Sequence, residues 1–148
     1  MAMVAGNEPQ GGEAPCLAPV LDDLGRVPDR IAVARAYGDQ AVAGRTRVLV
    51  DRVWPRGLTK ETLRLDRWLP AAAPSAELRR WFGHEAARWP EFARRYRAEL
   101  QHPPQADAVA ELLRLAAAAP LTLVFGARDL EHNQAVVLAA VLRERLRA

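Results

Sequence analysis

The sequence predicts a single compact α/β domain in which a small, mainly parallel sheet of three to four strands is flanked by helices. Short apolar runs bounded by glycine and proline predict strands, and longer segments with apolar residues at helical spacing predict helices. Their order along the chain is strand, strand, helices, strand, helix, which is typical of a layered α/β structure. A chain of 148 residues is long enough for one domain with a genuine core and too short for two.

Residues 1–28 lie outside this pattern. They contain several glycines and prolines and show no apolar periodicity. Such a segment is predicted to be a flexible N-terminal extension. The α/β domain is therefore expected over residues 29–148.

Three segments are predicted to be strands. The first, Ile31 to Tyr37, alternates apolar residues with alanine and arginine, and the second, Thr46 to Trp54, is apolar on both faces in its first half. The third, Leu121 to Phe125, is a short apolar run between Pro120 and Gly126 and is expected to be a central strand.

The orientation of the first strand is left open by the sequence. The loop of seven residues between the first two strands, 38–44, is short for a parallel crossover. The first two strands could therefore form an antiparallel pair within an otherwise parallel sheet.

Helices are predicted after the second strand and after the third. Ser75 precedes the segment ELRRWF and suits the N-cap of a short helix, and Pro90 suits the first turn of the next helix. The last helix is expected over Leu130 to Arg147, with Asp129 as its cap. Another helix is indicated by apolar residues spaced i, i+3, i+4 and i+7, namely Val109, Leu112, Leu113 and Ala116.

Composition excludes several classes of protein. No run approaches the roughly 18 apolar residues that cross a bilayer, and no Lys or Arg precedes Arg26, so a secretory signal is not expected. The single cysteine, Cys16, cannot form an internal disulfide and indicates a reducing compartment. A cytoplasmic location is therefore expected.

Common catalytic and cofactor motifs do not occur in the sequence. There is neither a Walker loop nor a G-x-G-x-x-G segment, and three histidines with one cysteine do not match a zinc site, so no metal site is expected. Ser75 is the only serine and serves better as a helix cap than as a nucleophile. No particular cofactor is indicated.

A first candidate site follows the second strand. In the segment from Asp51 to Gly57, Arg52 and Arg56 would bind an anionic group, Trp54 would provide an aromatic wall, and Asp51 would handle a proton. The alternative is a buried Asp–Arg network that only fixes the loop.

A second candidate site follows the third strand, in residues 126–133. If Asp129 caps the last helix, His132 and Asn133 lie in its first turn, where the helix dipole favours anions and keeps a histidine neutral. His132 is then a candidate base, with packing as the alternative role, and Asn133 a candidate ligand contact. Both segments follow strands, so in a parallel sheet both open at its carboxyl edge, where ligands bind in open α/β folds.

A third group lies around Trp81, Phe82 and His84. Core packing at helical spacing is the better interpretation for most of these aromatic residues. His84 follows a glycine at a helix junction, and it either closes over the site or caps the helix.

Four ordered motifs resemble a known family. The stretches RVLVDRVWPRGLTKE, APSAELRRWFGH, FARRYRAEL and PLTLVFGARDLEHNQAVVLAAVL are similar, in order and spacing, to the YeaO-like proteins of the DUF488 family, a domain of unknown function. The resemblance covers Arg30 to the C-terminus. It implies a compact α/β fold and no settled activity. The positions carried over from the resemblance are Asp51, Arg52, Trp54, Pro55, Arg56, Gly57, His132 and Asn133.

Three functions are compatible with the sequence. The preferred one is binding of a small anionic molecule, a nucleotide or phosphorylated metabolite, with or without catalysis. The second is a nucleic-acid-associated module that uses the arginines of the helices as a phosphate-facing surface, although the net charge is only +3 and the same helices carry glutamates. These arginines are Arg79, Arg80, Arg88, Arg94, Arg95 and Arg97. The third is a non-catalytic partner-binding or oligomeric protein. Reaction, cofactor and oligomeric state stay open.

Overall fold

A computed structural model describes residues 30–38 and 44–147 of the chain. The N-terminal extension expected over residues 1–28 and the single cysteine, Cys16, lie outside the described residues. No helix of the described ranges is both long and apolar enough to cross a membrane.

The sheet has four parallel strands in the order β1-β4-β2-β3. The first and second predicted strands, β1 (Ile31–Arg35) and β2 (Thr46–Leu49), do not pair with each other, because β4 (Leu121–Phe125) lies between them and is parallel to both. The antiparallel alternative for the first pair is therefore wrong, and the central position of the third predicted strand is confirmed. A two-residue edge strand, β3 (Arg67–Trp68), was not predicted.

Four of the described α-helices were indicated by the sequence, and a short helix over Lys60–Leu63 was not predicted. The helix ranges are α1 (Lys60–Leu63), α2 (Ala76–Phe82), α3 (Trp89–Glu99), α4 (Gln105–Ala118) and α5 (Gln134–Arg147). Ser75 caps α2 as predicted, because its hydroxyl accepts a hydrogen bond from the N–H of Leu78 at 3.1 Å. Pro90 lies in the first turn of α3, also as predicted. The predicted α/β class is thus confirmed.

The two faces of the sheet are covered differently. Successive strand residues point to opposite faces, so Leu123 and Phe125 belong to a large core with residues of α2, α3, α4 and α5, whereas Val124 belongs to a small cluster. That small cluster includes Leu63 of α1 and is packed by the loop that follows β2. The long helices therefore pack on one face, and the opposite face is covered by α1 and its neighbouring loops.

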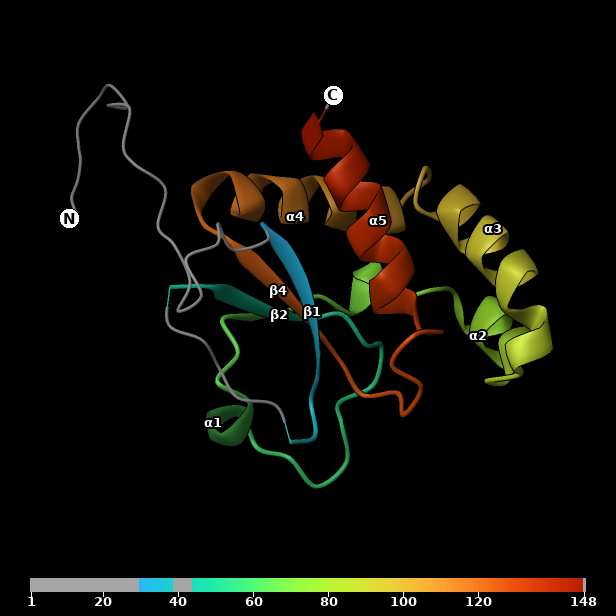
Figure 1. Cartoon of the computed structure of the whole chain (residues 1–148), viewed down its shortest axis with the longest axis horizontal. Coiled ribbons are helices and arrows are strands. Elements are labelled where there is room, and N and C mark those ends of the chain that lie inside the picture. Colours follow the sequence, from blue (N-terminus) through green and yellow to red (C-terminus); the bar gives the residue numbers. More distant parts are fainter. Residues whose placement is uncertain (1–29, 39–43, 148) are drawn as a thin grey trace.

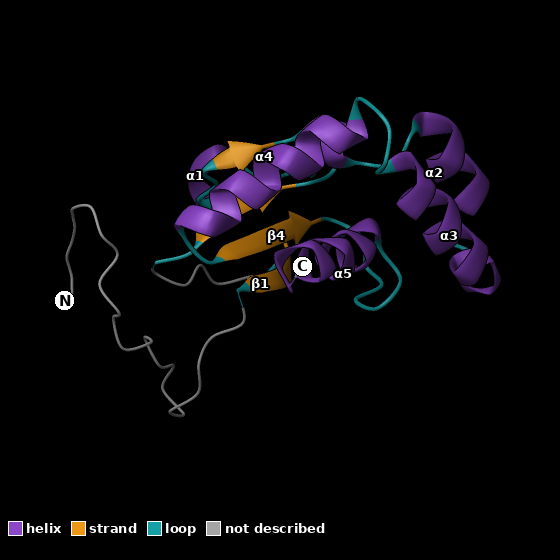
Figure 2. Cartoon of the chain, turned by 90° about the horizontal axis from the view of Figure 1, so that it is seen from above, coloured by secondary structure: helices purple, strands orange, loops and turns teal. Residues whose placement is uncertain are grey.

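The ends of the strands face a pair of helices. Figures 1 and 2 show α4 and α5 beside the strands, while α2 and α3 lie beyond the end to which the arrow of β4 points. Aromatic rings join this pair to each other: Phe82 of α2 stacks on Phe92 of α3 with ring centroids 4.3 Å apart.

Two strands and the last helix have different ends from those predicted. The first strand ends at Arg35 rather than at Tyr37, and β2 ends at Leu49 rather than at Trp54, so Asp51 and Arg52 lie in a loop. The last helix begins at Gln134, not at Leu130, because its N-cap is Asn133 and not Asp129.

Candidate functional site

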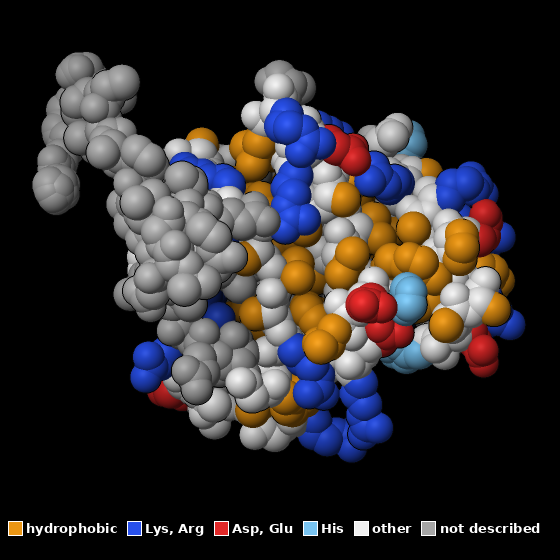
Figure 3. Space-filling model, viewed as in Figure 1, with side chains coloured by type: hydrophobic (Ala, Val, Ile, Leu, Met, Phe, Trp, Pro, Cys, Tyr) orange, Lys and Arg blue, Asp and Glu red, His pale blue; other side chains and the backbone are white. Residues whose placement is uncertain are grey.

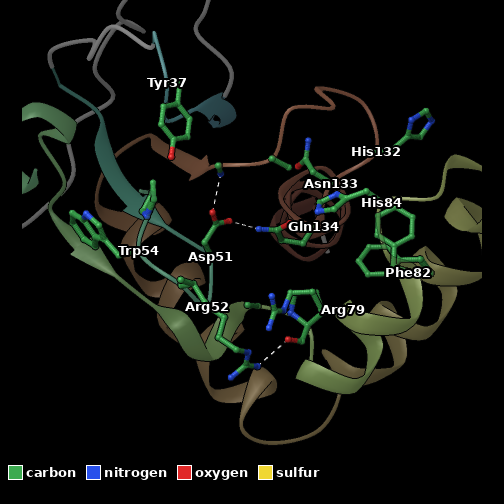
Figure 4. A pocket seen from close by; sticks show the side chains of 17 residues that line it. Tyr37, Asp51, Arg52, Trp54, Arg79, Phe82, His84, His132, Asn133 and Gln134 are labelled. Atoms are coloured by element: carbon green, nitrogen blue, oxygen red, sulfur yellow. Dashed lines mark hydrogen bonds between the residues drawn. The ribbon is translucent and has the colours of Figure 1, made fainter. Parts of the chain in front are cut away.

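A pocket of about 300 Å³ opens at the carboxyl edge of the sheet. Loops after β1, β2 and β4 line it, together with residues of α2 and α3 and the first residue of α5. Figure 4 shows Asp51 near its middle, with Tyr37 and Trp54 on one side and Phe82 and His84 on the other. The two predicted segments, after the second and third predicted strands, thus meet at one pocket, as parallel strands require.

Asp51 joins the loops after β2 and β4. Its Oδ2 accepts a hydrogen bond of 2.8 Å from the backbone N–H of Gly126, and its Oδ1 accepts one from the side-chain amide of Gln134. Burial raises the pKa of Asp51 above its ordinary value, while both hydrogen bonds act in the opposite direction. A carboxyl group with a raised pKa at the edge of a pocket can exchange a proton with a bound molecule.

Arg52 points away from Asp51. One of its terminal nitrogens, Nη2, donates a hydrogen bond of 2.8 Å to the carbonyl of Pro74, and its Nε is buried without a hydrogen-bond partner among the described residues. Neither Asp51 nor Arg52 forms an ion pair within residues 30–38 and 44–147. A buried Asp–Arg network at this loop, the alternative to a binding site, is therefore not observed within the described ranges.

The other arginine of the pocket was missed as a site residue. Arg79 projects from α2 and lines the pocket, and no acidic partner for it occurs in the part of the chain that the structure describes. From the sequence it was expected among the surface arginines of the helices. Arg56, which was predicted to bind the anion, is exposed and does not line this pocket, and its backbone carbonyl accepts a hydrogen bond from the hydroxyl of Tyr37.

His132 lines the pocket from the turn before α5, not from the first turn of that helix as predicted. Its Nδ1 lies 2.9 Å from Oδ2 of Asp129, and its ring meets the ring of Trp89 edge to face at 5.1 Å. Asp129 Oδ1 accepts hydrogen bonds from the N–H groups of Glu131 and His132, so Asp129 closes a turn instead of capping the helix. The hydrogen bond from Glu131, followed by that from the His132 side chain, lowers the pKa of Asp129.

Asn133 is the residue that caps α5. It is buried, its Oδ1 accepts a hydrogen bond of 3.2 Å from the N–H of Val136, and its Nδ2 donates one of 2.9 Å to the carbonyl of Asp129. Both polar ends of its side chain are thus occupied. The next residue, Gln134, was missed by the sequence analysis, although its position directly after the predicted pair would have suggested it.

Two further predicted residues, His84 and Trp54, lie at opposite ends of the pocket. His84 follows the C-terminus of α2 with a left-handed backbone, φ 58°, and its ring centroid lies 6.0 Å from that of Phe82. The indole N–H of Trp54 donates to the carbonyl of Leu58 at 2.7 Å, and its ring meets Trp68 edge to face. Within the described residues the His84 ring makes no hydrogen bond, whereas the indole N–H of Trp54 is bound within its own loop.

The arrangement combines positive groups with aromatic walls. Arg52 and Arg79 supply guanidinium groups, and α5 starts at the pocket, so the positive end of its dipole faces it. Within the residues that the structure describes, no group of three or more His, Cys, Asp or Glu gathers to hold a metal ion. The two guanidinium groups and the start of α5 thus give this part of the pocket a positive character.

The family of the chain follows from its comparison with known proteins. A family model described as the inactive DUF488-N3 subclade matches residues 30–148. The chain belongs to the DUF488 family. This confirms the resemblance carried by the four motifs.

Curated relatives of this DUF488 protein have no named activity. The uncharacterized protein Rv3073c of Mycobacterium tuberculosis is 41% identical over 116 residues, which are 78% of this chain and 96% of that protein. The uncharacterized protein YeaO of Escherichia coli K12 is 40% identical over 114 residues, 76% of this chain and 96% of its own. No solved structure gave a significant match to the DUF488 chain.

Proposed function

We propose that this protein binds a small anionic molecule, one that carries a phosphate group, in the pocket at the carboxyl edge of the sheet. The observation that carries the proposal is the contrast between the arginines of the pocket, which have no carboxylate partner among the described residues, and those of α3, which do. Arg52 and Arg79 line the pocket without a carboxylate partner among the described residues. A guanidinium group holds a phosphate through two parallel hydrogen bonds, so this pair is suited to a phosphate monoester.

Arginines on the neighbouring helices are already paired. Arg94 and Arg95 form ion pairs with Glu91, and Arg97 forms one with Glu144. The distances from guanidinium nitrogen to carboxylate oxygen are 2.6–2.9 Å. Hydrogen bonds from Arg94 and Arg95 lower the pKa of Glu91 to about 2, so this glutamate stays charged at neutral pH. The positive charge of the arginines on α3 is therefore neutralised by glutamates. The positive charge of the pocket arginines is not neutralised by a carboxylate of the described residues.

Binding without chemistry is the form of the proposal that the comparisons favour. The matching family model is described as an inactive subclade. Catalytic roles for His132 and Asp51 stay predictions, and each group is engaged in hydrogen bonds: Asp51 with Gly126 and Gln134, His132 with Asp129. We assign these residues to shaping the pocket.

A nucleic-acid surface has weaker support. On the described part of the face seen in Figure 3, Lys and Arg side chains form separate groups with acidic and hydrophobic side chains between them, and no single row of them runs across the face. Of the arginines predicted for such a surface, Arg88 and Arg95 lie over the ring of Trp81. A polyanion needs an extended row of free positive charge.

Thermal unfolding with added ligand tests the proposal. Inorganic phosphate, pyrophosphate, ribose 5-phosphate and AMP are added to the full chain at millimolar concentration, and a rise in Tm with concentration is expected. The Arg52→Gln and Arg79→Gln variants are expected to lose the rise. Arg80→Gln, which changes the exposed neighbour of Arg79 outside the pocket, is the matched control and should keep it.

Two outcomes would overturn the proposal. The first is the absence of any rise in Tm with all four compounds. The second is a rise that persists in the Arg52→Gln, Arg79→Gln double variant, because the anion would then bind elsewhere. Recovery of altered ligand after long incubation would contradict the non-catalytic part.

A further inference from the structure

The pocket has a positive end and an aromatic end that lie one helical turn apart. Arg79 and Phe82 are spaced i, i+3 on α2, so their side chains lie on the same face, with Cβ atoms roughly 5–6 Å apart. A molecule whose phosphate meets Arg79 therefore extends along this face toward Phe82. His84 adds a second ring there, 6.0 Å from that of Phe82.

The aromatic end next to α2 has an unoccupied ring. His84 is exposed and makes no hydrogen bond with any residue of the described ranges. Its backbone is left-handed, which costs free energy for a residue other than glycine and is found at sites where a side chain must be held in one direction. In Figure 4 this ring lies on the pocket side of Phe82.

The aromatic residues on the β1 side of the pocket, Tyr37 and Trp54, already interact with other residues of the protein. Arg35 lies 4.9 Å above the centre of the Tyr37 ring, and the Tyr37 hydroxyl donates to the Arg56 carbonyl. The Trp54 N–H is likewise bound to its own loop. A planar ligand ring consequently finds its free partner at His84 and not at Tyr37.

Hydrogen-bond acceptors line the same pocket. Each oxygen of Asp51 accepts one hydrogen bond from the protein, and a carboxylate oxygen has room for a second. The hydroxyl groups of a sugar can donate hydrogen bonds to these carboxylate oxygens. The pocket volume of about 300 Å³ is at the lower end of the range for small-molecule sites, which suits a single mononucleotide and not a dinucleotide.

We propose that the anion is a nucleoside monophosphate, with its phosphate held by Arg52 and Arg79 and its base packed against His84 beside Phe82. This inference rests on the proposed anion site and selects, among phosphorylated molecules, those with an aromatic base. Stacking of a base on an aromatic side chain tightens binding by about fivefold or more. A phosphorylated sugar without a base lacks that contribution.

Isothermal titration of the full chain distinguishes the two proposals. AMP and UMP are expected to bind at least about fivefold more tightly than ribose 5-phosphate, and adenosine, which has no phosphate, more weakly than AMP. In His84→Asn, which removes the ring and tolerates the left-handed backbone, AMP should bind only as well as ribose 5-phosphate. His84→Phe, which restores an aromatic face, should recover the preference for AMP.

The outcomes separate a failure of this inference from a failure of the anion site. Equal affinity for AMP and ribose 5-phosphate would overturn the nucleotide inference and leave the anion site standing. Preference for AMP that survives in His84→Asn would overturn the place assigned to the base. If neither compound binds, both proposals are overturned.

Discussion

The carboxylate of Asp51 accepts a 2.8 Å hydrogen bond from the backbone N–H of Gly126, which lies 75 positions further along the chain. This contact joins the loop after β2 to the loop after β4 at the edge of the pocket. A Cβ added to Gly126 would lie 2.8 Å from Oδ2 of Asp51, which is too close for both to stay in place. Glycine is therefore favoured here because a larger residue would displace the Asp51 carboxylate, and not because the backbone is left-handed.

Gly126→Ala is expected to displace the Asp51 carboxylate and to lower the free energy of unfolding by about 1–3 kcal/mol. In an Asp51→Ala background the same change should cost much less, because the group it meets is gone. A double-mutant cycle measured by urea unfolding gives the coupling between the two positions.

A matched control for this cycle is Gly57→Ala. Gly57 has a φ of 82° and nothing near its added Cβ, so alanine there costs backbone strain alone, about 1–2 kcal/mol. That cost should be the same with and without Asp51. Additive costs for Gly126 and Asp51 would contradict the proposed clash.

Asp51→Asn is expected to change how stability depends on pH. Burial raises the pKa of Asp51 in the folded chain above the ordinary 3.8, so the unfolded chain loses this proton first. The contribution of the group to stability is therefore full below pH 3.8 and falls as pH rises through the folded-state pKa. Asparagine does not titrate, and its oxygen still accepts from Gly126 while the Gln134 amide turns to present its own oxygen.

Urea unfolding of both chains from about pH 3 to pH 8 checks this prediction. The stability of Asp51→Asn relative to the natural chain should rise with pH across the interval above 3.8. Two curves that stay parallel over the whole range would show that Asp51 titrates alike in the folded and unfolded chains.

Elements with strong local signals could be predicted from the sequence. All residues of β4 are buried, and its continuous apolar run indicated a central strand. Ser75 and Pro90 marked the starts of α2 and α3 because capping and the first helical turn have simple chemical requirements.

Elements defined by tertiary contacts could not be predicted in the same way. The edge strand β3 consists of two exposed residues and exists through its pairing with Val48 and Leu49 of β2. At the start of α5, Asp129 and Asn133 are both good caps by type. The three-dimensional turn decides between them, because the Asp129 carboxylate is taken by Glu131 and His132.

The part of the candidate site that is formed by the loops after the strands could be predicted from the sequence. Asp51 and His132 follow different strands, and the parallel sheet brings both to one pocket. Arg79 was missed because α2 reaches the pocket from beyond the sheet, which no local pattern indicates. Arg56 was expected there, yet its loop has turned away from the pocket by that residue.

Ser75→Ala is expected to lower the free energy of unfolding by about 1 kcal/mol, within a range of 0.5–2. The Ser75 hydroxyl caps α2 at the N–H of Leu78, and Glu99 of α3 accepts from both the N–H and the hydroxyl of Ser75. Ser75→Thr keeps an oxygen in the same place and should retain most of the stability. Equal losses in the two variants, measured by urea unfolding, would show that the hydroxyl does not act as the cap.

Replacement of Asn133 separates its two roles at the start of α5. Asn133→Ala removes both the acceptor for the Val136 N–H and the donor to the Asp129 carbonyl, and a loss of about 1–3 kcal/mol is expected. Asn133→Ser keeps a capping oxygen and lacks the donor, so its stability should fall between those of the natural chain and the alanine variant. Hydrogen exchange at the Val136 amide gives a local measurement. Its N–H also donates to the backbone carbonyl of Asn133 at 3.2 Å, a bond that every variant keeps, so exchange should be faster in the alanine variant than in the serine variant by the share that the side-chain oxygen contributes. Equal exchange in the two would mean that the side chain at 133 does not cap α5, and that the turn around Asp129 alone sets where the helix begins.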